Sequence, residues 1–584
     1  MEIRLPATSY LFRTSGVAGY LLLLPIVSIA LLVRLHSPAY ITECLWYEDG
    51  TVYITESYEL GARSLWMTDS GGYLFLFHRL IALFAKQFPL ILTPYMFFIA
   101  WLISFTSIVW VVKTRGNQLG LDSLSVLLVI VAIACQPSQG EPWFNLNHAN
   151  FFLGIALALY ICMPVKRAES VPEVVFLILA SLTGVFSIVM TAVLAIQLVV
   201  LRDFSARKAT YIVVPICGIV QAIFVIASQR LQQTRFDRNL LDWLNAIATF
   251  LSFGTTSRVI YIAAGLFWTV VGIYVYKWIT NKEVQADRIL WLSPLFSLAA
   301  AAMMYFVGAL AGMPEFSPVD MASRYFLIPY SLVFFVAFVC TSHRKMAQIA
   351  LACLAGVVCA GEFRTVDGAD RESSTGLLAH TNLQWTAFAK FQKVEPDLVI
   401  PINSPLPIYP PDAHVQIAKE VANAAVRGRL ARKPIILDSH RSDVTVDPMR
   451  RGDSHSGAGG SPTLSFDIGN YCVTNRYLAL EIDIWRARMG FAKVHWGHPG
   501  GFAAQNSLER FYPAGPVTMQ FAFRRDIADS TIEFDPALGV KDSAIVRTLM
   551  QDANAPVDPK ITVATVTPPG GQVEVKEARL FCLE

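Results

Sequence analysis

Long apolar runs separated by short polar segments fill the first 361 residues of this 584-residue chain. A helix crosses the hydrocarbon layer with roughly 20 residues, so these runs predict about eleven membrane-spanning helices. The run 171–201 is too long for one span and is interrupted at Thr183-Gly184, so we expect two short helices that form a hairpin. The other predicted spans are residues 17–34, 90–112, 121–135, 151–165, 211–227, 259–276, 289–310, 326–340 and 346–360.

Charged residues between the runs predict the orientation. Lys113, Arg115 and Lys166 lie in loops on one side of the predicted membrane, whereas the first loop on the other side carries Glu48 and Asp49. Cytoplasmic loops are enriched in Lys and Arg. We therefore predict a multi-pass protein of a bacterial inner (plasma) membrane, with a cytoplasmic N-terminus and a periplasmic or extracellular C-terminal region.

Two further apolar segments fit helices that lie along the membrane surface. Residues 73–88 are too short to span and contain His78-Arg79, which we expect to lie near lipid headgroups. A second amphipathic segment, within residues 229–258, has one apolar face formed by Leu240, Leu241, Leu244 and Ile247.

The pattern changes after residue 361. Residues 362–462 form a connector with several prolines, a predicted helix from about His414 to Arg427 and a mobile loop over 441–462. From Thr463 onward, apolar residues alternate with polar ones, which predicts a β-sandwich. Its expected strands are residues 463–468, 477–485, 491–496, 517–523, 561–566 and 573–582. The predicted domains are thus 1–361, 362–462 and 463–584.

Composition supports the membrane assignment. Apolar residues make up 54% of the chain and charged residues only 16%, against about 25% charged residues in soluble domains. The net charge of +3 gives no reason to expect a nucleic-acid partner.

Several polar residues fall on the predicted outer side and are candidates for chemistry. Transfer of a sugar from a lipid phosphate needs a carboxylate that accepts a proton and cations that hold the leaving phosphate. Asp49, with Glu48 second, is the candidate base, and the candidates for holding the phosphate are Arg324, Arg79 and His78. The candidates for contacting substrate include Glu141, Asn147 and His148.

Several of these residues also have a plainer explanation, and Glu141 fits a loop acid. Glu48-Asp49 fits an ordinary solvated loop, Arg324 fits a snorkelling side chain at a helix end, and His148 fits a histidine at the membrane surface. Their occurrence together on one predicted side is more informative than any single residue.

The layout resembles the GT-C superfamily of polytopic glycosyltransferases. Glu48-Asp49 and residues 73–88 stand where that family has an acidic pair after the first helix and an interfacial helix, and Ser323-Arg324-Tyr325 resembles a late Arg-Tyr motif. The resemblance covers residues 1–361 and implies a polyprenyl-phosphate-linked sugar donor, with Tyr325 as a further substrate contact. The pair is Glu-Asp rather than Asp-x-Asp, so we predict no obligatory metal and no cofactor. The C-terminal domain resembles the lectin-like sandwiches of some members.

The sequence therefore predicts an inverting membrane glycosyltransferase whose acceptor is an extracytoplasmic glycan, a lipid-linked glycan or a protein. One alternative is a transporter or flippase for a lipid-linked sugar, which would place charge on broken helices near the bilayer midplane. Another is a non-catalytic membrane scaffold that displays a glycan-binding domain.

Overall fold

The computed structural model describes the helical part of the chain almost continuously and the C-terminal part mainly through its strands. The described residues are 17–35, 39–42, 45–46, 48–68, 72–119, 121–138, 142–163, 167–202, 204, 207–228, 240–254, 257–286, 288–311, 323–342, 344–361, 385–391, 400–401, 414–415, 435–436, 464–467, 477–486, 490–497, 507–512, 515–524, 531–538, 564–566 and 573–583. They divide into a helical unit, drawn from residues 1–38, 62–84 and 96–371, and a strand unit, drawn from residues 39–61, 85–95 and 372–584.

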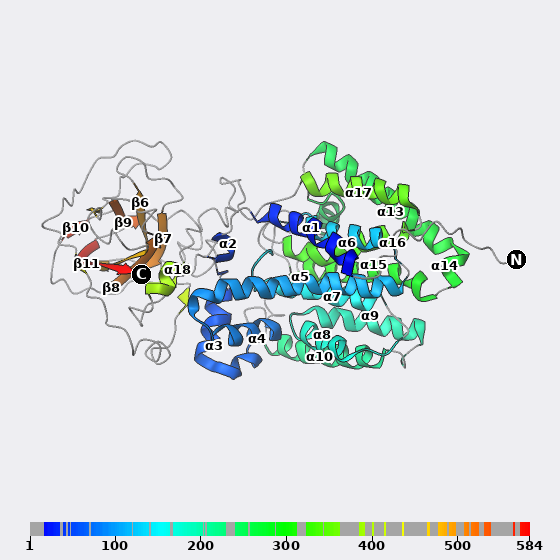
Figure 1. Cartoon of the computed structure of the whole chain (residues 1–584), viewed down its shortest axis with the longest axis horizontal. Coiled ribbons are helices and arrows are strands. Elements are labelled where there is room, and N and C mark those ends of the chain that lie inside the picture. Colours follow the sequence, from blue (N-terminus) through cyan, green and yellow to red (C-terminus); the bar gives the residue numbers. More distant parts are fainter. Residues whose placement is uncertain are drawn as a thin grey trace. The chain divides into compact units, whose positions relative to one another are not determined.

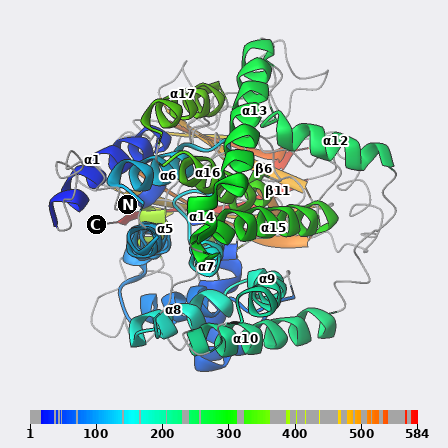
Figure 2. The same ribbon diagram turned by 90° about the vertical axis from the view of Figure 1, so that its right-hand side faces the viewer.

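The helical unit is built around two helices whose residues are all buried, α7 (Ala149–Cys162) and α16 (Leu327–Cys340). Figure 2 shows α16 in the middle of its neighbours, and it packs against α6, α7, α13 and α15. The remaining elements are α1 Val17–Arg34, η3 Gly61–Trp66, α4 Leu76–Ala85, α5 Thr93–Gln118, α6 Ser123–Cys135, α8 Val171–Ser181, α9 Phe186–Leu201, α10 Lys208–Ala227, α12 Leu240–Leu251, α13 Arg258–Thr280, α14 Lys282–Ala286, α15 Arg288–Ala311, η6 Ser323–Phe326 and α17 Lys345–Gly361 (Figure 1).

Every predicted span contains a helix, and five of the described helices are long and apolar enough to cross a membrane by length and composition. Helix α10 shows why a bilayer is needed. Its residues Ile212, Ile216, Ile219, Ile223 and Ile226 follow a spacing of three and four, and all are between 47% and 66% exposed. That spacing puts them on one face of the helix, where only lipid or another protein would cover them. The chain is thus a multi-pass membrane protein, while its orientation and the count of eleven stay predictions.

The predicted hairpin within residues 171–201 is confirmed as helices α8 and α9. Gly184 has a φ of 93°, in the left-handed region that favours glycine, and it lies between the two helices. At the start of α8, the Glu173 carboxylate accepts hydrogen bonds from the backbone N–H and the hydroxyl of Ser170, both at 2.8 Å, so the helix begins where a capping residue is available. Helix α12 confirms the second amphipathic segment, since Leu241, Leu244 and Ile247 share an exposed face.

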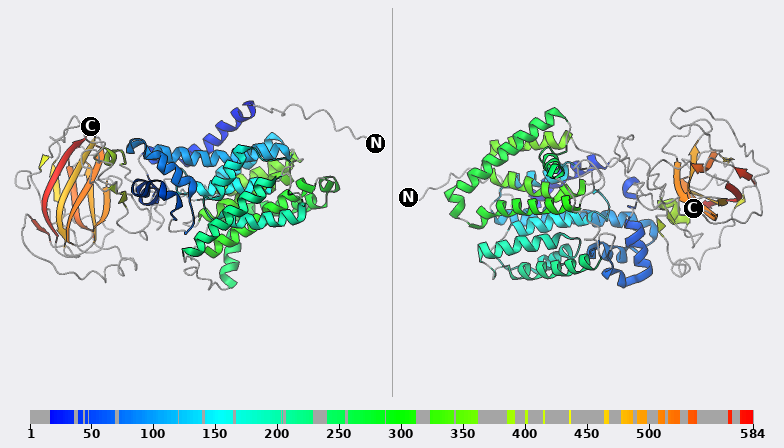
Figure 3. Two further views of the ribbon diagram at one scale, coloured as in Figure 1. Left: turned by 90° about the horizontal axis from the view of Figure 1, so that it is seen from below. Right: turned by 180° about the vertical axis from the view of Figure 1, so that it is seen from behind.

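The strand unit contains two antiparallel sheets and a short two-stranded ribbon (Figure 3). One sheet has the order β10-β11-β5-β8 with β3 also paired to β11, and the other has the order β4-β9-β6-β7. The strands of the whole unit are β1 Ile400–Pro401, β2 His414–Val415, β3 Ile435–Ile436, β4 Leu464–Asp467, β5 Tyr477–Arg486, β6 Gly490–Gly497, β7 Ser507–Tyr512, β8 Gly515–Arg524, β9 Thr531–Leu538, β10 Ala564–Val566 and β11 Val573–Leu583. All six predicted strands are present, and the packing of the sheets as a sandwich stays a prediction.

Five strands were not predicted, namely the two-residue strands β1, β2 and β3 and the longer strands β7 and β9. The two longer strands were missed for identifiable reasons. Strand β7 lies at the edge of its sheet, where the adjacent charges of Glu509 and Arg510 are tolerated although they break the alternation. Strand β9 contains Pro536, which falls at an irregularity in the pairing between β6 and β9. A proline cannot donate a ladder hydrogen bond, so it is tolerated at such a bulge.

The predicted helix from His414 to Arg427 is wrong at its start. His414 and Val415 form strand β2, paired antiparallel with Ile400–Pro401, because the β-branched residues Ile400 and Val415 lie opposite each other and favour paired strands. Residues 416–427 and the predicted mobile loop 441–462 lie outside the described residues. The connector also contains a helix the sequence did not predict, α18 (Trp385–Phe391).

The strand unit also includes parts of the chain that precede α5. These are α2 (Ala39–Thr42), η2 (Asp49–Ile54), α3 (Thr55–Leu60) and η4 (Leu90–Leu92). The Trp385 indole Nε1 donates to the carbonyl of Leu90 at 2.9 Å, and β2 packs against η2. The segment that carries Glu48 and Asp49 therefore belongs to the same unit as the C-terminal strands.

Candidate functional site

The segment that leads into α4 is tied by hydrogen bonds to the turn between α8 and α9. The side chain of Gln221 both accepts from the Leu74 N–H at 2.9 Å and donates to the Leu74 carbonyl at 3.1 Å. The Leu76 N–H donates to the Leu182 carbonyl at 3.0 Å, and the Phe77 N–H donates to the Thr183 hydroxyl at 3.0 Å. The broken hairpin thus fixes the start of α4 and the two residues that follow.

Those two residues, His78 and Arg79, are fully buried, while Leu80 and Phe84 of the same helix are 39% and 57% exposed. The expectation that the basic pair lies near lipid headgroups is therefore wrong. Helix α4 turns apolar side chains outward and its basic side chains into the helical unit. Burial of a charge is costly unless it is compensated, so a buried arginine here points to a polar interior.

His78 is held as a neutral ring. Its Nε2 lies 3.1 Å from the carbonyl oxygen of Asn147, which can only accept, so Nε2 carries the proton and Nδ1 is the acceptor nitrogen. The rings of Phe75 and Phe77 lie 4.9 and 6.1 Å from it. Burial lowers the pKa of His78 to about 3, and the charges of His148 and Arg79 act in the same direction. Near neutral pH, His78 is a hydrogen-bonding group rather than a cation.

His148 is oriented by its neighbour Asn145. The Asn145 Nδ2 donates to the Trp143 carbonyl at 3.1 Å, which fixes the amide so that its Oδ1 is the acceptor. That oxygen accepts the His148 backbone N–H at 3.0 Å and lies 2.9 Å from His148 Nδ1. The Asn145 oxygen can only accept, so His148 Nδ1 carries a proton and donates it in this hydrogen bond.

Arg34, at the end of α1, anchors the loop that carries these residues. Its guanidinium is fully buried, donates to the carbonyls of Ala134 at 2.9 Å and Gln136 at 2.5 Å, and lies 4.1 Å from the centre of the Trp143 ring. Sequence reasoning missed Arg34 and Gln221 as positioning residues. Arg34 and Gln221 were detectable only as polar groups at the edge of or inside apolar runs.

Tyr325 joins the same cluster from η6. Its ring lies 6.3 Å from Phe151 in an edge-on arrangement, and Phe151 lies 6.0 Å from the ring of His148. Gly308 lets Tyr325 approach α15, because a Cβ at that position would lie only 3.1 Å from the Cβ of Tyr325. The Arg324 guanidinium lies 5.3 Å from the Tyr325 ring centre and is partly exposed.

Glu48 and Asp49 lie in the strand unit, at the beginning of the π-helix η2. Asp49 is 1% exposed and Glu48 is half-buried, so Asp49 is not the solvated loop acid of the plainer explanation. The turn is closed by the Gly50 N–H, which donates to the Trp46 carbonyl at 3.2 Å, and by the Thr55 hydroxyl, which donates to the Gly50 carbonyl at 2.8 Å. Single π-helical turns are frequent at functional sites.

The structure thus brings together His78, Arg79, Asn147, His148 and Tyr325 within the helical unit, with Arg324 beside Tyr325. Asp49 and Glu48 belong to the other unit, so a shared site stays a prediction, and Glu141 lies outside the described residues. Within the described part of the chain, no group of three or more His, Cys, Asp or Glu side chains is arranged to hold a metal ion. The expected independence of metal stays a prediction.

No protein-family model matches the sequence, and no curated protein matches it. Among solved structures, the chain is similar to the cryo-EM structure of arabinosyltransferase EmbB from Mycobacterium smegmatis, with 11% identity and a TM-score of 0.24. The match covers 100% of this chain and 66% of that chain, so this chain spans just under two thirds of that protein's length. A likeness this weak carries no argument about activity, which has to rest on the residues themselves.

Proposed function

We propose that this protein is an integral-membrane glycosyltransferase that moves a sugar from a polyprenyl-phosphate donor to an extracytoplasmic glycan, a lipid-linked glycan or a protein. The observation that carries the proposal is the cluster of buried Arg79, His78 and His148 with the half-buried Tyr325, drawn from three separate segments of a lipid-exposed helical unit. A buried cation beside neutral hydrogen-bonding groups and an aromatic ring suits a ligand that joins a phosphate to a sugar.

The reaction we propose is a single inverting displacement. An acceptor hydroxyl oxygen attacks the anomeric carbon of the donor sugar while the bond from that carbon to the phosphate oxygen breaks. The proton of the hydroxyl passes to the carboxylate of Asp49, and the electron pair of the broken bond leaves with polyprenyl phosphate. Arg79 and Arg324 would stabilise the growing charge on that phosphate.

The two histidines, His78 and His148, have different roles from the arginines Arg79 and Arg324. Because His78 is neutral, it would contribute a hydrogen bond to the phosphate or to the sugar rather than positive charge. His148, whose Nδ1 is held by Asn145, would form a hydrogen bond between its Nε2 and a sugar hydroxyl. Asn147 positions His78 through its carbonyl, and Tyr325 would pack against the sugar ring.

The test is transfer of labelled sugar from polyprenyl-phosphate donors in membranes that contain the full chain. Asp49→Asn should reduce transfer by about 10²- to 10⁴-fold, the range typical of general-base removal. Glu59→Gln, an exposed acid of the same unit, is the matched control and should leave transfer unchanged. Retained transfer in a folded Asp49→Asn protein would remove the assignment of the base.

Arginine variants test the phosphate contact separately. Arg79→Gln should reduce transfer by about 10²- to 10³-fold, as removal of one stabilising donor typically does. Arg63→Gln removes an exposed arginine of the same unit and should have no effect. If no donor is turned over but lipid-linked sugar changes leaflets, the protein is a transporter. If neither occurs while the chain binds glycan, it is a scaffold.

A further inference from the structure

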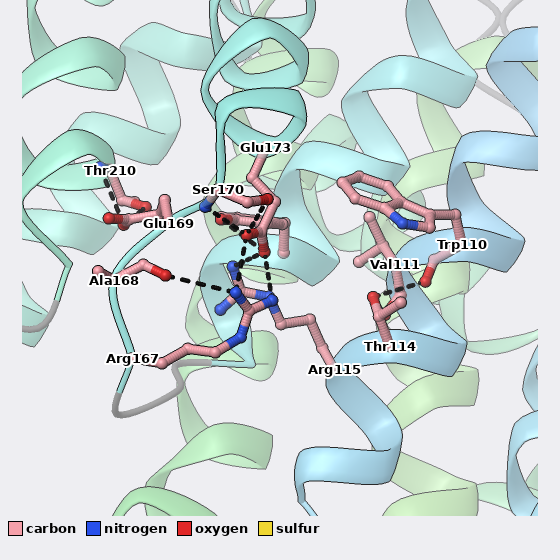
Figure 4. A network of polar contacts seen from close by, with 11 residues as sticks. Trp110, Val111, Thr114, Arg115, Arg167, Ala168, Glu169, Ser170, Glu173 and Thr210 are labelled. Carbon is pink, nitrogen blue, oxygen red and sulfur yellow. Dashed lines mark hydrogen bonds and ion pairs between the residues drawn. The ribbon is translucent and has the colours of Figure 1, made fainter. Parts of the chain in front are cut away.

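A second polar cluster lies at the opposite ends of α7, α8 and α9 from the residues discussed above, and the proposed glycosyl transfer does not use it. Figure 4 shows its centre, where Arg115 Nη2 lies 2.8 Å from Glu173 Oε1. Arg167 makes a second, bidentate pair with the same carboxylate at 2.9 and 3.0 Å. Ser170 and the hydroxyl of Tyr160 donate to it as well. Both carboxylate oxygens of Glu173 therefore already accept hydrogen bonds from several donors.

Arg207 adds a third guanidinium without a carboxylate of its own. It is 3% exposed, and its Nη1 donates to the neutral side-chain oxygen of Gln197 at 3.0 Å. It interacts electrostatically with Arg115, Tyr160 and Glu169. The Glu169 carboxylate is itself occupied by the backbone N–H of Thr210 at 3.1 Å and by the Thr210 hydroxyl at 2.5 Å. The cluster thus holds three arginines and two carboxylates.

The excess positive charge coincides with unused hydrogen-bond donors. Arg115 Nε and Nη1, and Arg207 Nε and Nη2, are buried and have no hydrogen-bond partner among the described residues. A buried donor left unsatisfied costs about 1–3 kcal/mol, and more on a charged group. Ring contacts offset part of this cost, since Arg115 lies 3.7 Å from the centre of the Tyr160 ring. The ring contacts do not provide hydrogen bonds to these four nitrogen atoms, which have no acceptor among the residues that the structure describes.

We propose that Arg115 and Arg207 form a binding site for a phosphate group, supplied by the headgroup of an anionic membrane lipid. A phosphate presents several acceptor oxygens and a delocalised negative charge. A planar guanidinium can donate two parallel hydrogen bonds to two of these oxygens. The beginning of α10, a 20-residue helix whose backbone starts beside Arg207, adds partial positive charge. Arg167, whose side chain is 43% exposed, connects the cluster to the surface.

A lipid is the favoured source because of where the cluster lies. It occupies the ends of spans at the loops predicted to be cytoplasmic, the leaflet face where anionic lipids attract basic residues. Helix α10, which begins next to Arg207, carries the exposed isoleucine stripe on its outer face, so acyl chains would have an apolar surface on the same helix.

The experiment is a lipid titration of the purified full chain in a neutral detergent, followed by thermal unfolding. Phosphatidylglycerol, phosphatidylcholine and inorganic phosphate are added separately. We expect the wild type to bind phosphatidylglycerol at least about tenfold more tightly than phosphatidylcholine, whose choline neutralises its phosphate. Arg207→Gln should remove this preference, while Arg202→Gln, an exposed arginine on the same segment, should retain it.

Each outcome decides the matter. Loss of the preference in Arg207→Gln alone supports the lipid site. Stabilisation by inorganic phosphate that depends on Arg207, without lipid preference, supports a phosphate site and overturns the lipid source. Equal binding of both lipids by the wild type with no effect of phosphate overturns the proposal, even if Arg207→Gln fails to fold. So does an unchanged preference in a folded Arg207→Gln protein.

Discussion

His78 should make the folded protein sensitive to acid. Its imidazole is fully buried against Phe75 and Phe77, and this burial lowers its pKa to about 3, well below the ordinary value of about 6.5. Between the two pKa values, His78 is therefore protonated in the unfolded chain but stays neutral in the folded chain. The free energy of unfolding is therefore unaffected by His78 above pH 6.5 and decreases as the pH falls from 6.5 towards 3.

The size of the effect follows from the two pKa values. Between pH 8 and pH 5 the unfolded chain takes up most of a proton at this position and the folded chain takes up almost none. The linkage relation then gives a loss of about 2 kcal/mol from this one residue. The substitution His78→Gln keeps a donor that can reach the Asn147 carbonyl but does not titrate, so it should remove this part of the pH dependence.

The assay is unfolding of the detergent-purified chain at pH 8 and pH 5, for wild type and His78→Gln. We expect the wild type to lose about 2 kcal/mol more than the variant between the two pH values. The variant His495→Gln, in strand β6, should keep the wild-type difference. An equal loss in wild type and His78→Gln would refute the buried, neutral histidine and with it the role we give His78.

Three other substitutions test the packing that positions the two clusters, each by thermal unfolding. Gly218→Ala should cost about 1–3 kcal/mol by overpacking, because its Cβ would lie 2.6 Å from the Thr191 hydroxyl and 3.0 Å from a backbone oxygen, whereas Gly265→Ala meets nothing within 4 Å and should be neutral or stabilising. Glu173→Gln should cost about 3–5 kcal/mol, since it removes the carboxylate shared by two arginines, and a neutral result would contradict the pairing. Gln221→Leu should cost about 2 kcal/mol through its two hydrogen bonds to Leu74 and should also reduce sugar transfer, whereas loss of stability with full transfer would argue against a positioning role.

Local pattern predicted most of the longer elements of this chain. The apolar runs predicted a helix at every span, because the length and composition of a run determine whether it can satisfy its backbone inside lipid. The interruption at Thr183-Gly184 predicted the turn between α8 and α9, because a glycine is needed where φ is positive. The alternating runs predicted six strands of the C-terminal region, and failed for β7 and β9, where edge charges and a proline hide the period.

The sequence offered candidate residues for the site but not how they are arranged. Sequence order alone placed His78, Arg79, His148 and Tyr325 on one side of a membrane, but it assigned the basic pair to lipid headgroups. The structure buries that pair because the start of α4 is held by Gln221, 147 residues away from Leu74, and by Thr183. Apolar residues occur all around α4, so its sequence would allow either face of the helix to be buried. Contacts with the neighbouring helices determine which face is buried.

The same division holds for the second cluster. The sequence shows that Arg115, Arg167 and Arg207 lie near the ends of predicted spans, where basic residues are common and need no partner. Only the tertiary structure shows that they converge on Glu173 and Gln197 and that four of their nitrogen atoms have no hydrogen-bond partner in the described part of the chain. Hydropathy and turn residues act within a few positions and so determine helices and strands locally. Burial, tautomers and charge balance depend on which distant side chains meet, and those pairings exist only in the folded chain.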